Sequence, residues 1–543
     1  MSADRGQSDA DAPDSATHAT REAMSPASPW QSEIDELHER REMAYALGGE
    51  ERVVSHNERG NLTVRQRIEY LLDQGTFEEV GVLTGAAAYG EDGRVSTVTP
   101  ANSVIGTGRI GGCRTMVAGD DFTVRGGSSE ASIPDKWIFA ETYATEHRVP
   151  LVRLVDAAGG SIKLLEKAQS TKLGGYPAWK TSELLGTVPV VGVALGPCAG
   201  LGAMKVCLSH FSVMVQGSSQ VFSGGPLVVA PGVGQAVDKE SLGGFRVHSR
   251  GSGVVDNDAA TEEEALDQVK TFLSYMPSSV FELPPVESEP EPGDARDEAL
   301  RSIIPRDRRK PYQARSVLER VLDPGSVFEI GKYWGRPMIT ALGRLGGRPV
   351  GILQSDPFHV GGALTADAAE KATRFVDLCD TFHLPIVSLV DQPGLYVGKQ
   401  AEEQGTAREA LRLMLAIEQS SVPWCVVVLR RAFGLGGGIL SPTKRASTRV
   451  AWPSAHWGSI PIEGGVDAAH RREIAAHHDP DARRAELTEH YRQFESPFRT
   501  AERFGINDII DPADTPGVLR NWCDEAYRLL PELIGPRAHT FRV

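Results

Sequence analysis

The sequence predicts an α/β protein built from two tandem copies of one domain. Four segments recur 234 or 235 residues further along the chain. In both copies, short apolar runs alternate with helix-compatible stretches, which favours βαβ units. A Pro- and Glu-rich stretch separates the two copies. We therefore expect one domain over residues 31–285, a linker over 286–300 and a second domain over 301–543.

The repeat carries most of this prediction, because a fixed spacing identifies a duplicated fold before any element is assigned. One offset shared by four separate segments indicates that the whole domain was copied. The paired segments are 108–112 with 343–347, 121–127 with 356–362, 149–156 with 384–391, and 200–202 with 434–436.

Composition and periodicity predict the individual elements in chain order. Residues 1–30 are rich in Ser, Ala, Asp, Thr and Pro, lack an apolar centre, and predict a disordered tail. Buried strands that alternate with helices predict a parallel sheet. The other expected elements are an exposed helix over 32–47, an amphipathic helix over 62–73, a strand over 148–155, a short helix over 182–185 and a strand over 188–195.

Charge and cysteine content exclude several classes of protein. The 543 residues carry a formal net charge of −15 and no basic block, so we expect neither nucleic acid nor a membrane surface as partner. No apolar run reaches the roughly 18 residues that a membrane-spanning helix needs. The six cysteines form no Cys-x-x-Cys pair, which predicts no metal site and a reducing compartment, most simply the cytoplasm.

Two glycine-rich turns are the strongest candidates for a functional site. In residues 188–206 and again in 422–440, an apolar strand runs into glycines and then into helix-compatible sequence. Such a turn can present backbone N–H groups at a helix N-terminus, where they stabilise a developing oxyanion. The alternative is that these glycines only allow close packing of helix and strand. Asp156 and Asp391, which end the preceding strands, could position a substrate or simply form turns.

The sequence resembles the carboxyltransferase β subunit of biotin-dependent acyl-CoA carboxylases, the propionyl-CoA and methylcrotonyl-CoA carboxylase group. The resemblance covers about residues 60–530 and implies two crotonase-like (ClpP/crotonase) domains in a transferase or ligase. The segments that carry it are 119–128, 196–200, 220–226, 242–253, 272–277, 370–394 and 451–453.

The resemblance also implies roles for individual residues. The first turn would hold the thioester oxygen of an acyl-CoA substrate, and the second would hold the ureido oxygen of biotin; no metal is implied. The first turn comprises Gly200, Leu201 and Gly202, and the second comprises Leu435 and Gly436. Substrate would also be bound by Gly159, Gly160, Asp391, Gly394, Gly437 and Gly438, and biotin by Gly434 and Phe433.

The implied reaction needs partners. Carboxybiotin would arrive on a biotin carboxylase and biotin carrier α subunit, since this chain shows no ATP-binding or carrier segment. The acyl-CoA would react as an enolate at its α-carbon or vinylogous carbon. The family's half-sites come from different subunits of a dimer, within a hexamer that is a trimer of dimers.

The sequence departs from the family pattern at the expected site. Leu201 and Leu435 stand where the family usually has glycine, and residues 156–163 and 356–362 lack the usual motifs. A leucine adopts a positive φ only at a cost. These departures leave two alternatives open, a decarboxylase or transcarboxylase acting on a β-carboxyl thioester, and a non-catalytic paralogue. Lysines 163, 167 and 172 could bind CoA phosphates or form a solvated helix face.

Overall fold

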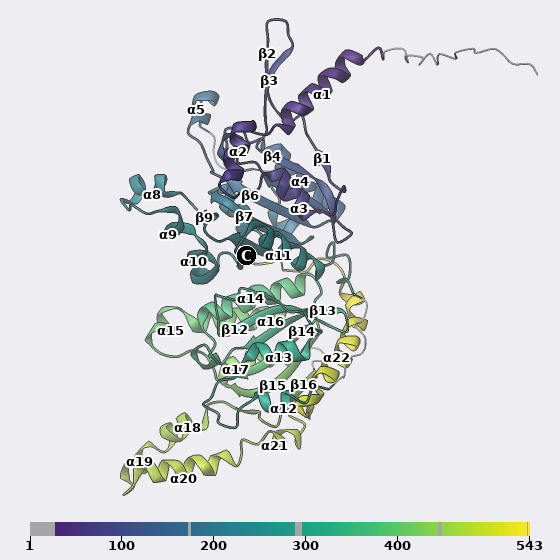
Figure 1. Ribbon diagram of the computed structural model, residues 1–543. Helices are drawn as coiled ribbons and strands as arrows, with labels where there is room; N and C mark the ends of the chain where they lie inside the picture. The colour runs from purple at the N-terminus through teal and green to yellow at the C-terminus, as the bar shows by residue number, and fades with distance from the viewer. Residues whose placement is uncertain (1–27, 172–174, 177, 288–295, 444–447, 540) are drawn as a thin grey trace, which may run out of the picture.

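The computed structural model describes residues 28–543 apart from 172–174, 177, 288–295, 444–447 and 540. Most of the expected tail and linker therefore lies outside the described residues. The described chain forms two sheets of eight strands each and one separate two-stranded hairpin. In Figure 1 the first half, purple to teal, lies above the second half, green to yellow.

The first half is a twisted sheet with helices packed around it. Its strands run in the order β1-β4-β5-β6-β7-β8-β10, and β9 pairs with β7. These strands are β1 Glu78–Val80, β4 Ser103–Ile110, β5 Cys113–Asp120, β6 Leu151–Ala157, β7 Val190–Ala199, β8 Phe211–Val215, β9 Gln220–Phe222 and β10 Asn257–Ala259. The helices are α1 Gln31–Tyr45, α2 Glu50–Glu58, α3 Val64–Leu71, α4 Pro134–His147, α5 Lys163–Ala168, α6 Thr181–Leu185, α7 Leu201–Cys207, α8 Pro226–Val233, α9 Lys239–Gly243, α10 Phe245–Val247 and α11 Glu262–Ser274.

The second half repeats this topology strand for strand. Its order is β11-β12-β13-β14-β15-β16-β18, and β17 pairs with β15. The strands are β11 Phe328–Ile330, β12 Met338–Leu345, β13 Arg348–Ser355, β14 Ile386–Gln392, β15 Trp424–Phe433, β16 Thr448–Ala451, β17 His456–Gly458 and β18 Asp508–Ile509. The helices are α12 Leu300–Ile303, α13 Ala314–Val321, α14 Ala366–Thr381, α15 Lys399–Glu403, α16 Thr406–Gln419, α17 Gly434–Leu440, α18 Ile462–Ala469, α19 Arg471–Ala476, α20 Pro480–Arg492, α21 Pro497–Ala501 and α22 Thr515–Leu529.

Each sheet is mixed, which corrects the expectation of a purely parallel one. Strands β4 and β5 pair antiparallel, as do β12 and β13, whereas β5 to β8 and β13 to β16 pair parallel. The antiparallel pairing arises at the repeated Gly-Gly pairs, each of which forms the turn of a hairpin. Gly111 and Gly112, like Gly346 and Gly347, have positive φ, as a two-residue hairpin turn requires. The sequence therefore marks a tight hairpin at the start of each copy, before the parallel strands begin.

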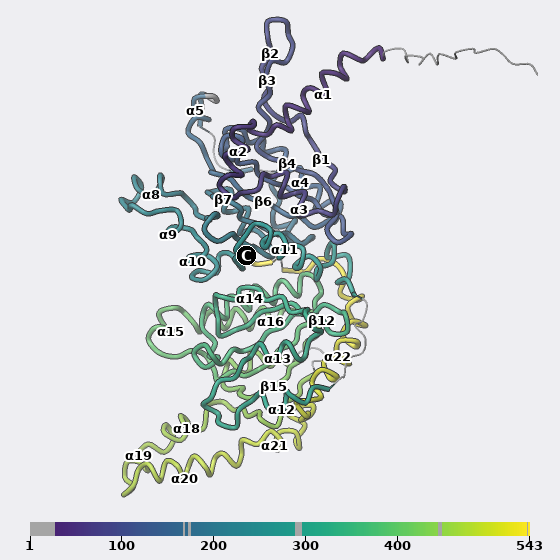
Figure 2. Tube along the Cα trace, in the orientation of Figure 1, coloured from purple at the N-terminus to yellow at the C-terminus, as the bar shows by residue number. Residues whose placement is uncertain are grey.

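The two halves pack directly against each other through aromatic side chains. The ring of Phe211 stacks on Phe272 at 5.0 Å between centroids and meets Phe328 of the second half edge-on at 5.4 Å. Helices α11 and α14 face each other across this boundary in Figure 2. Arg374 of α14 donates to the backbone oxygen of Ser209 at 3.0 Å. One hydrophobic core therefore continues from the first half into the second.

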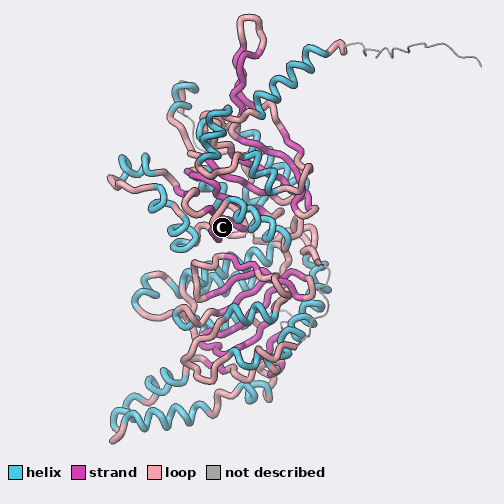
Figure 3. The backbone as a smooth tube through the Cα atoms, viewed as in Figure 1, coloured by secondary structure: helices cyan, strands magenta, loops and turns pink. Residues whose placement is uncertain are grey.

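Several elements project from this body. Helix α1 and the hairpin of β2 (Gly85–Tyr89) and β3 (Val95–Pro100) extend from the upper end, and α18 to α20 extend from the lower end (Figure 3). The expected helices over 32–47, 62–73 and 182–185 correspond to α1, α3 and α6. Among the described residues, no helix is both long and apolar enough to cross a bilayer.

Candidate functional site

Both glycine turns have the same backbone geometry. Strand β7 ends at Ala199 and α7 begins at Leu201, so Gly200 is the hinge between them. Gly200 and Gly434 each have a φ of 57°. The left-handed conformation therefore falls on glycine in both copies, and the leucine that follows is an ordinary residue of the first helical turn. Leu201 and Leu435 carry no backbone strain, contrary to what the departure from the family pattern suggested.

The helix N-termini at these turns leave backbone donors without a partner in the described chain. Within the described residues, the backbone N–H groups of Leu201 and Gly202 donate to no acceptor of the chain, and neither do those of Leu435 and Gly436. The first turn of any α-helix leaves such groups without an intrahelical partner. Two adjacent donors at a fixed angle can bind one oxygen atom that carries negative charge.

Small residues let each helix lie close to the strand beneath it. A Cβ on Gly202 would lie 3.3 Å from the backbone oxygen of Ala157, and a Cβ on Gly436 would lie 3.0 Å from the backbone carbon of Gly394. A Cβ on Gly437 would overlap the backbone of Ala432. The packing explanation for these glycines is therefore correct, and it is compatible with the functional one, because close packing is what fixes the position of the donors.

The other predicted glycines lie on segments that cross in front of the strand ends. Gly159 has a φ of 89°, and its oxygen accepts from Ser129 N–H at 3.0 Å. Gly394 has a φ of 129°, and its oxygen accepts from Leu364 N–H at 3.0 Å. Gly160 has open space around it. In each half, the segment that contains these glycines therefore lies next to the glycine turn: Gly159 is beside Ala199, and Gly394 is beside Gly436.

Asp391 is buried rather than exposed at the site. Its Oδ2 accepts from Arg430 at 2.8 Å, and its Oδ1 accepts from the side chain of Arg431 at 2.6 Å and from the Arg431 backbone at 3.2 Å. Burial alone would raise the pKa of Asp391, but the two arginines outweigh it and lower the pKa. Both carboxylate oxygens are engaged within the chain, so this residue holds Arg431 in place, and Arg431 in turn donates to Gly361 oxygen at 2.8 Å.

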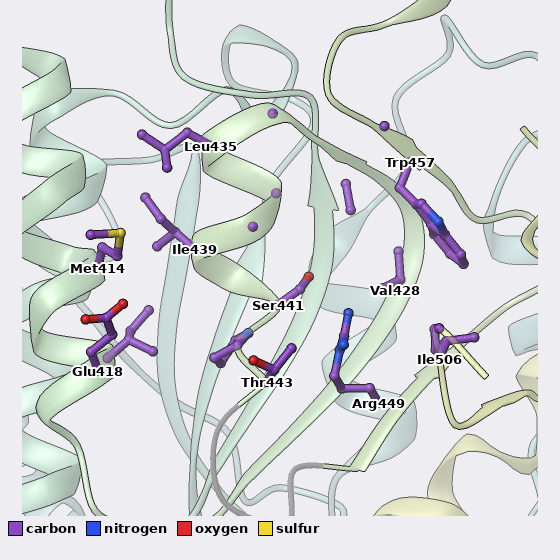
Figure 4. A pocket seen from close by; sticks show the side chains of 18 residues that line it. Met414, Glu418, Val428, Leu435, Ile439, Ser441, Thr443, Arg449, Trp457 and Ile506 are labelled. Atoms are coloured by element: carbon purple, nitrogen blue, oxygen red, sulfur yellow. The ribbon is translucent and has the colours of Figure 1, made fainter. Parts of the chain in front are cut away.

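A cavity of about 720 Å³ lies along α17 beside the second turn. Leu435 and Ile439 of α17 point toward Met414 of α16, and Trp457 and Ile506 stand on the opposite side (Figure 4). Gly434, Gly437 and Gly438 also line it. The walls are mainly apolar, with polar groups at the lower end. Every described residue that lines it belongs to the second half, so the described part of one chain does not join the two turns in this cavity.

Phe433 has a different place from the one expected for a biotin contact. Its side chain is 4% exposed and meets the ring of His456 edge-on at 5.6 Å. It precedes α17 as the N-cap residue and anchors the turn in the core. Gly438, by contrast, is exposed, and a Cβ there would meet nothing within 4 Å, so packing does not explain this glycine.

Sequence reasoning missed most of the cavity wall. Met414 lies on α16, Arg449 on β16 and Trp457 on β17, and only folding brings them beside α17. Arg449 is half-buried, and burial lowers its pKa. Arg430 and Arg431, which do not line this cavity, are adjacent in an otherwise apolar strand and indicate a buried carboxylate partner without identifying it as Asp391.

Comparison with known proteins identifies the protein family of the chain. The carboxyl transferase domain family matches residues 55–527. The carboxyltransferase subunit of propionyl-CoA carboxylase from Haloferax mediterranei is 38% identical over 89% of this chain and 93% of its own length. The methylmalonyl-CoA carboxyltransferase 12S subunit of Propionibacterium freudenreichii subsp. shermanii is 34% identical over 90% of this chain and 93% of its own. The alpha subunit of methylmalonyl-CoA decarboxylase from Veillonella parvula is 30% identical over 90% and 95%.

A solved structure agrees with these relatives. The transcarboxylase 12S hexamer assembly, with methylmalonyl-coenzyme A and methylmalonic acid bound, superimposes with a TM-score of 0.82 at 31% identity. The match covers 93% of this chain and 97% of that one. This likeness confirms the predicted pair of tandem crotonase-like domains.

Proposed function

The chain belongs to the carboxyl transferase family, and from that premise we propose that it transfers a carboxyl group from biotin on a partner carrier to an acyl-CoA. Carboxyl transfer on acyl-CoA is the activity of the family to which the chain belongs. The identity of the donor, the enolate course of the reaction and the residues that stabilise it are our proposal. The acceptor is the α-carbon of the acyl group or its vinylogous carbon.

The paired donors at the two turns support this proposal most directly. The N–H groups of Leu201 and Gly202 bind the thioester oxygen as it gains charge, and those of Leu435 and Gly436 bind the ureido oxygen. When bound, carboxybiotin supplies both the carboxyl group and the base. The chain then needs no acid or base of its own, only orientation and oxyanion stabilisation, where one donor contributes about 3 kcal/mol.

The residues at the second turn fit a biotin head. A fused ring with one urea oxygen needs a strong donor pair next to an apolar wall. The turn offers the donor pair, and Met414, Ile439 and Trp457 offer the wall. Gly437 and Gly438 line the same cavity and leave space for the acyl group to approach.

A complete site requires a second copy of the chain. The cavity at the second turn has no wall from the first half. We infer that the first turn of one copy faces the second turn of another, in a dimer within a larger ring. The hexamer of the 12S relative supports this arrangement. A biotin carboxylase and carrier subunit completes the enzyme.

The test is an assay of the full-length protein copurified with its biotin-carrying subunit. ATP, bicarbonate and a panel of acyl-CoAs are supplied, and products are identified by mass spectrometry. A mass gain of one carboxyl group on at least one acyl-CoA is expected. Inactivity across the panel, with a stable complex still formed, would instead identify a non-catalytic paralogue.

One observation favours a second reaction direction. The sequence differs from the family pattern at the site itself, around Leu435, and a relative of similar length is named as a decarboxylase subunit. In that case the enzyme would take the carboxyl group from a β-carboxyl thioester. Release of CO2 from methylmalonyl-CoA without ATP would establish decarboxylation, and its absence alongside ATP-dependent carboxylation would eliminate it.

A further inference from the structure

A second, smaller cavity of about 390 Å³ lies in the first half, away from both turns. It is bounded by α2 and by the loop that follows β5. Among the described residues, three guanidinium groups line it, together with one carboxylate, that of Glu51. The arginines are Arg52 and Arg59 from α2 and Arg125 from the loop. In a chain with a net charge of −15, this concentration of positive charge is unusual.

These three arginines are not used to stabilise the fold through ion pairs. Arg52 reaches only the backbone oxygen of Thr123, at 3.5 Å, and Arg59 donates to the Ser55 hydroxyl at 3.2 Å. Among the described residues, none of the three has a carboxylate within ion-pair distance. By contrast, the buried Arg67 nearby is bound by both Asp156 and Glu262. The cleft arginines therefore keep their donors for a ligand.

The cleft has a rigid floor. The ring of His56 is buried, lies 6.1 Å from the ring of Phe122, and hydrogen-bonds Leu62 oxygen at 3.1 Å. Burial, followed by the neighbouring Arg67, lowers the pKa of His56 and disfavours its charged form. Gly48 N–H donates to the Thr123 hydroxyl at 3.0 Å and ties the start of α2 to the loop.

The loop connects the cleft to the first turn. Arg125, Gly126 and Gly127 all have positive φ, between 54° and 64°. Gly126 oxygen accepts from Ala158 N–H at 3.2 Å, so the loop lies against the segment that passes beneath Gly202. This contact links the edge of the cleft to the segment that lies beside the first turn.

The second half supplies an internal control. Val360 occupies the place of Arg125, with a φ of 40° and an exposed side chain. The left-handed loop is therefore a property of the fold in both copies. The second-half loop also contacts an arginine, since Arg431 donates to Gly361 oxygen at 2.8 Å, but Arg431 is ion-paired with Asp391. The three cleft arginines differ in having no such carboxylate partner among the described residues, and they lie in the half that the proposed function assigns to acyl-CoA.

We propose that Arg52, Arg59 and Arg125 bind the phosphate groups of the coenzyme A portion of the substrate. The inference rests on the proposed function, because it names how that site holds its polyanionic substrate. Guanidinium groups bind phosphate oxygens in bidentate fashion, which suits three donors around one small cleft. Lys163, a residue the sequence suggested for this role, lies 4.0 Å from Glu130 and is 72% exposed, which makes it a solvated side chain.

The test measures binding without turnover. Isothermal titration of the full-length protein is carried out with coenzyme A, 3′-dephospho-coenzyme A, pantetheine and ATP. The variants are Arg59→Ala, Arg125→Ala and the triple variant that adds Arg52→Ala. Arg41→Ala, an exposed arginine of α1 outside the cleft, is the matched control. Arg59→Lys keeps a charge but loses the bidentate fork.

We expect each single alanine variant to raise the Kd of coenzyme A about tenfold, and the triple variant more than a hundredfold. Pantetheine binding and the control variant should not change, and Arg59→Lys should recover part of the loss. A smaller loss for 3′-dephospho-coenzyme A would identify the 3′-phosphate as the bound group. Thermal unfolding of each variant confirms that the fold is intact.

Two results overturn the inference. One is unchanged coenzyme A binding by the folded triple variant. The other is ATP binding as tight as that of coenzyme A and equally sensitive to the variants, which would make the cleft a site for free nucleotides. Failure of the proposed function has a different signature: coenzyme A binds through the arginines, yet no acyl-CoA gains or loses a carboxyl group, and the cleft assignment then stands.

Discussion

The two halves place an aspartate at the same point of the same strand and surround it differently. Asp156 is the last residue but one of β6, and Asp391 is the last residue but one of β14. Asp156 is paired with Arg67, at 3.0 Å, and Arg67 also binds Glu262 at 2.7 Å. Asp391 is paired with both Arg430 and Arg431, and no other acid of the described chain forms an ion pair with either arginine. Burial, only partly offset by Arg67, raises the pKa of Asp156 to about 6, whereas the pKa of Asp391 is lowered.

The neighbouring strand explains this difference. In the register of the parallel pairs, Ala157 faces Cys198 and Gln392 faces Ala432, so Gly196 and Arg430 occupy equivalent positions. A Cβ at Gly196 would overlap Asp156 Oδ1, an oxygen that has no hydrogen-bond partner in the described chain. The duplication preserved the backbone of the two halves, and their charge networks then diverged. We therefore expect the two copies to respond differently to the same substitution.

The largest difference is expected from replacing the two aspartates. Asp391→Asn leaves Arg430, 3% exposed, and Arg431 without their counter-charge, which should cost about 3–5 kcal/mol of unfolding free energy. Asp156→Asn should cost about 1 kcal/mol or less, because Glu262 still binds Arg67 through two hydrogen bonds. Urea unfolding of the two variants, followed by circular dichroism, measures the difference. Equal losses would mean that the two networks are equivalent after all.

A second difference is expected between the turns. Gly436→Ala would place a Cβ 3.0 Å from Gly394, so α17 and its donors must move. Since a displacement of about 1 Å at a site can cost on the order of a hundredfold in rate, kcat should fall by that order. Gly202→Ala meets Ala157 at 3.3 Å and should cost about tenfold.

Steady-state kinetics with the biotin-carrying subunit measures both variants. Gly464→Ala, in α18 with open space around it, is the control and should keep full activity. A larger loss in Gly202→Ala than in Gly436→Ala would reverse the order of rigidity that the packing indicates.

The aspartates also predict a pH dependence. The folded pKa of Asp156, about 6, lies above the usual value near 4, so the native state binds the extra proton between these pH values. The unfolding free energy should therefore fall as pH rises from 4 to 6, by on the order of 1–3 kcal/mol. Asp391 acts in the opposite direction, and its stabilisation is lost as pH falls below about 4. Urea unfolding at pH 4.5 and 7 should show the first slope in the wild type and not in Asp156→Asn.

The sequence predicted the fold better than the chemistry of the site. A repeat at constant spacing identifies two domains because each copy must bury its own sheet. The glycine turns were identifiable because a strand, a glycine and a helix are consecutive in the chain. The burial of Asp391 was not, since its partners Arg430 and Arg431 lie on the next strand. Met414 and Trp457 could not be assigned to the cavity, because neither has a local pattern that marks it as a wall. Local motifs are thus predictable, and contacts between distant segments are not.

The smallest effect is expected at the leucines that follow the two hinge glycines. Leu201→Gly and Leu435→Gly restore a residue closer to the family pattern, yet the positive φ lies on Gly200 and Gly434. Glycine in a helix costs about 1 kcal/mol relative to a helix-forming residue, so each variant should lose about that much stability. Activity should stay within about threefold, because the N–H donor remains.

Leu435 is 45% exposed and lines the cavity at the second turn, whereas Leu201 does not line it. Any change in preference among acyl-CoAs should therefore occur in Leu435→Gly alone. Thermal unfolding and the acyl-CoA panel measure the two properties, and a loss of more than tenfold in either variant would show that the leucine side chain itself shapes the site.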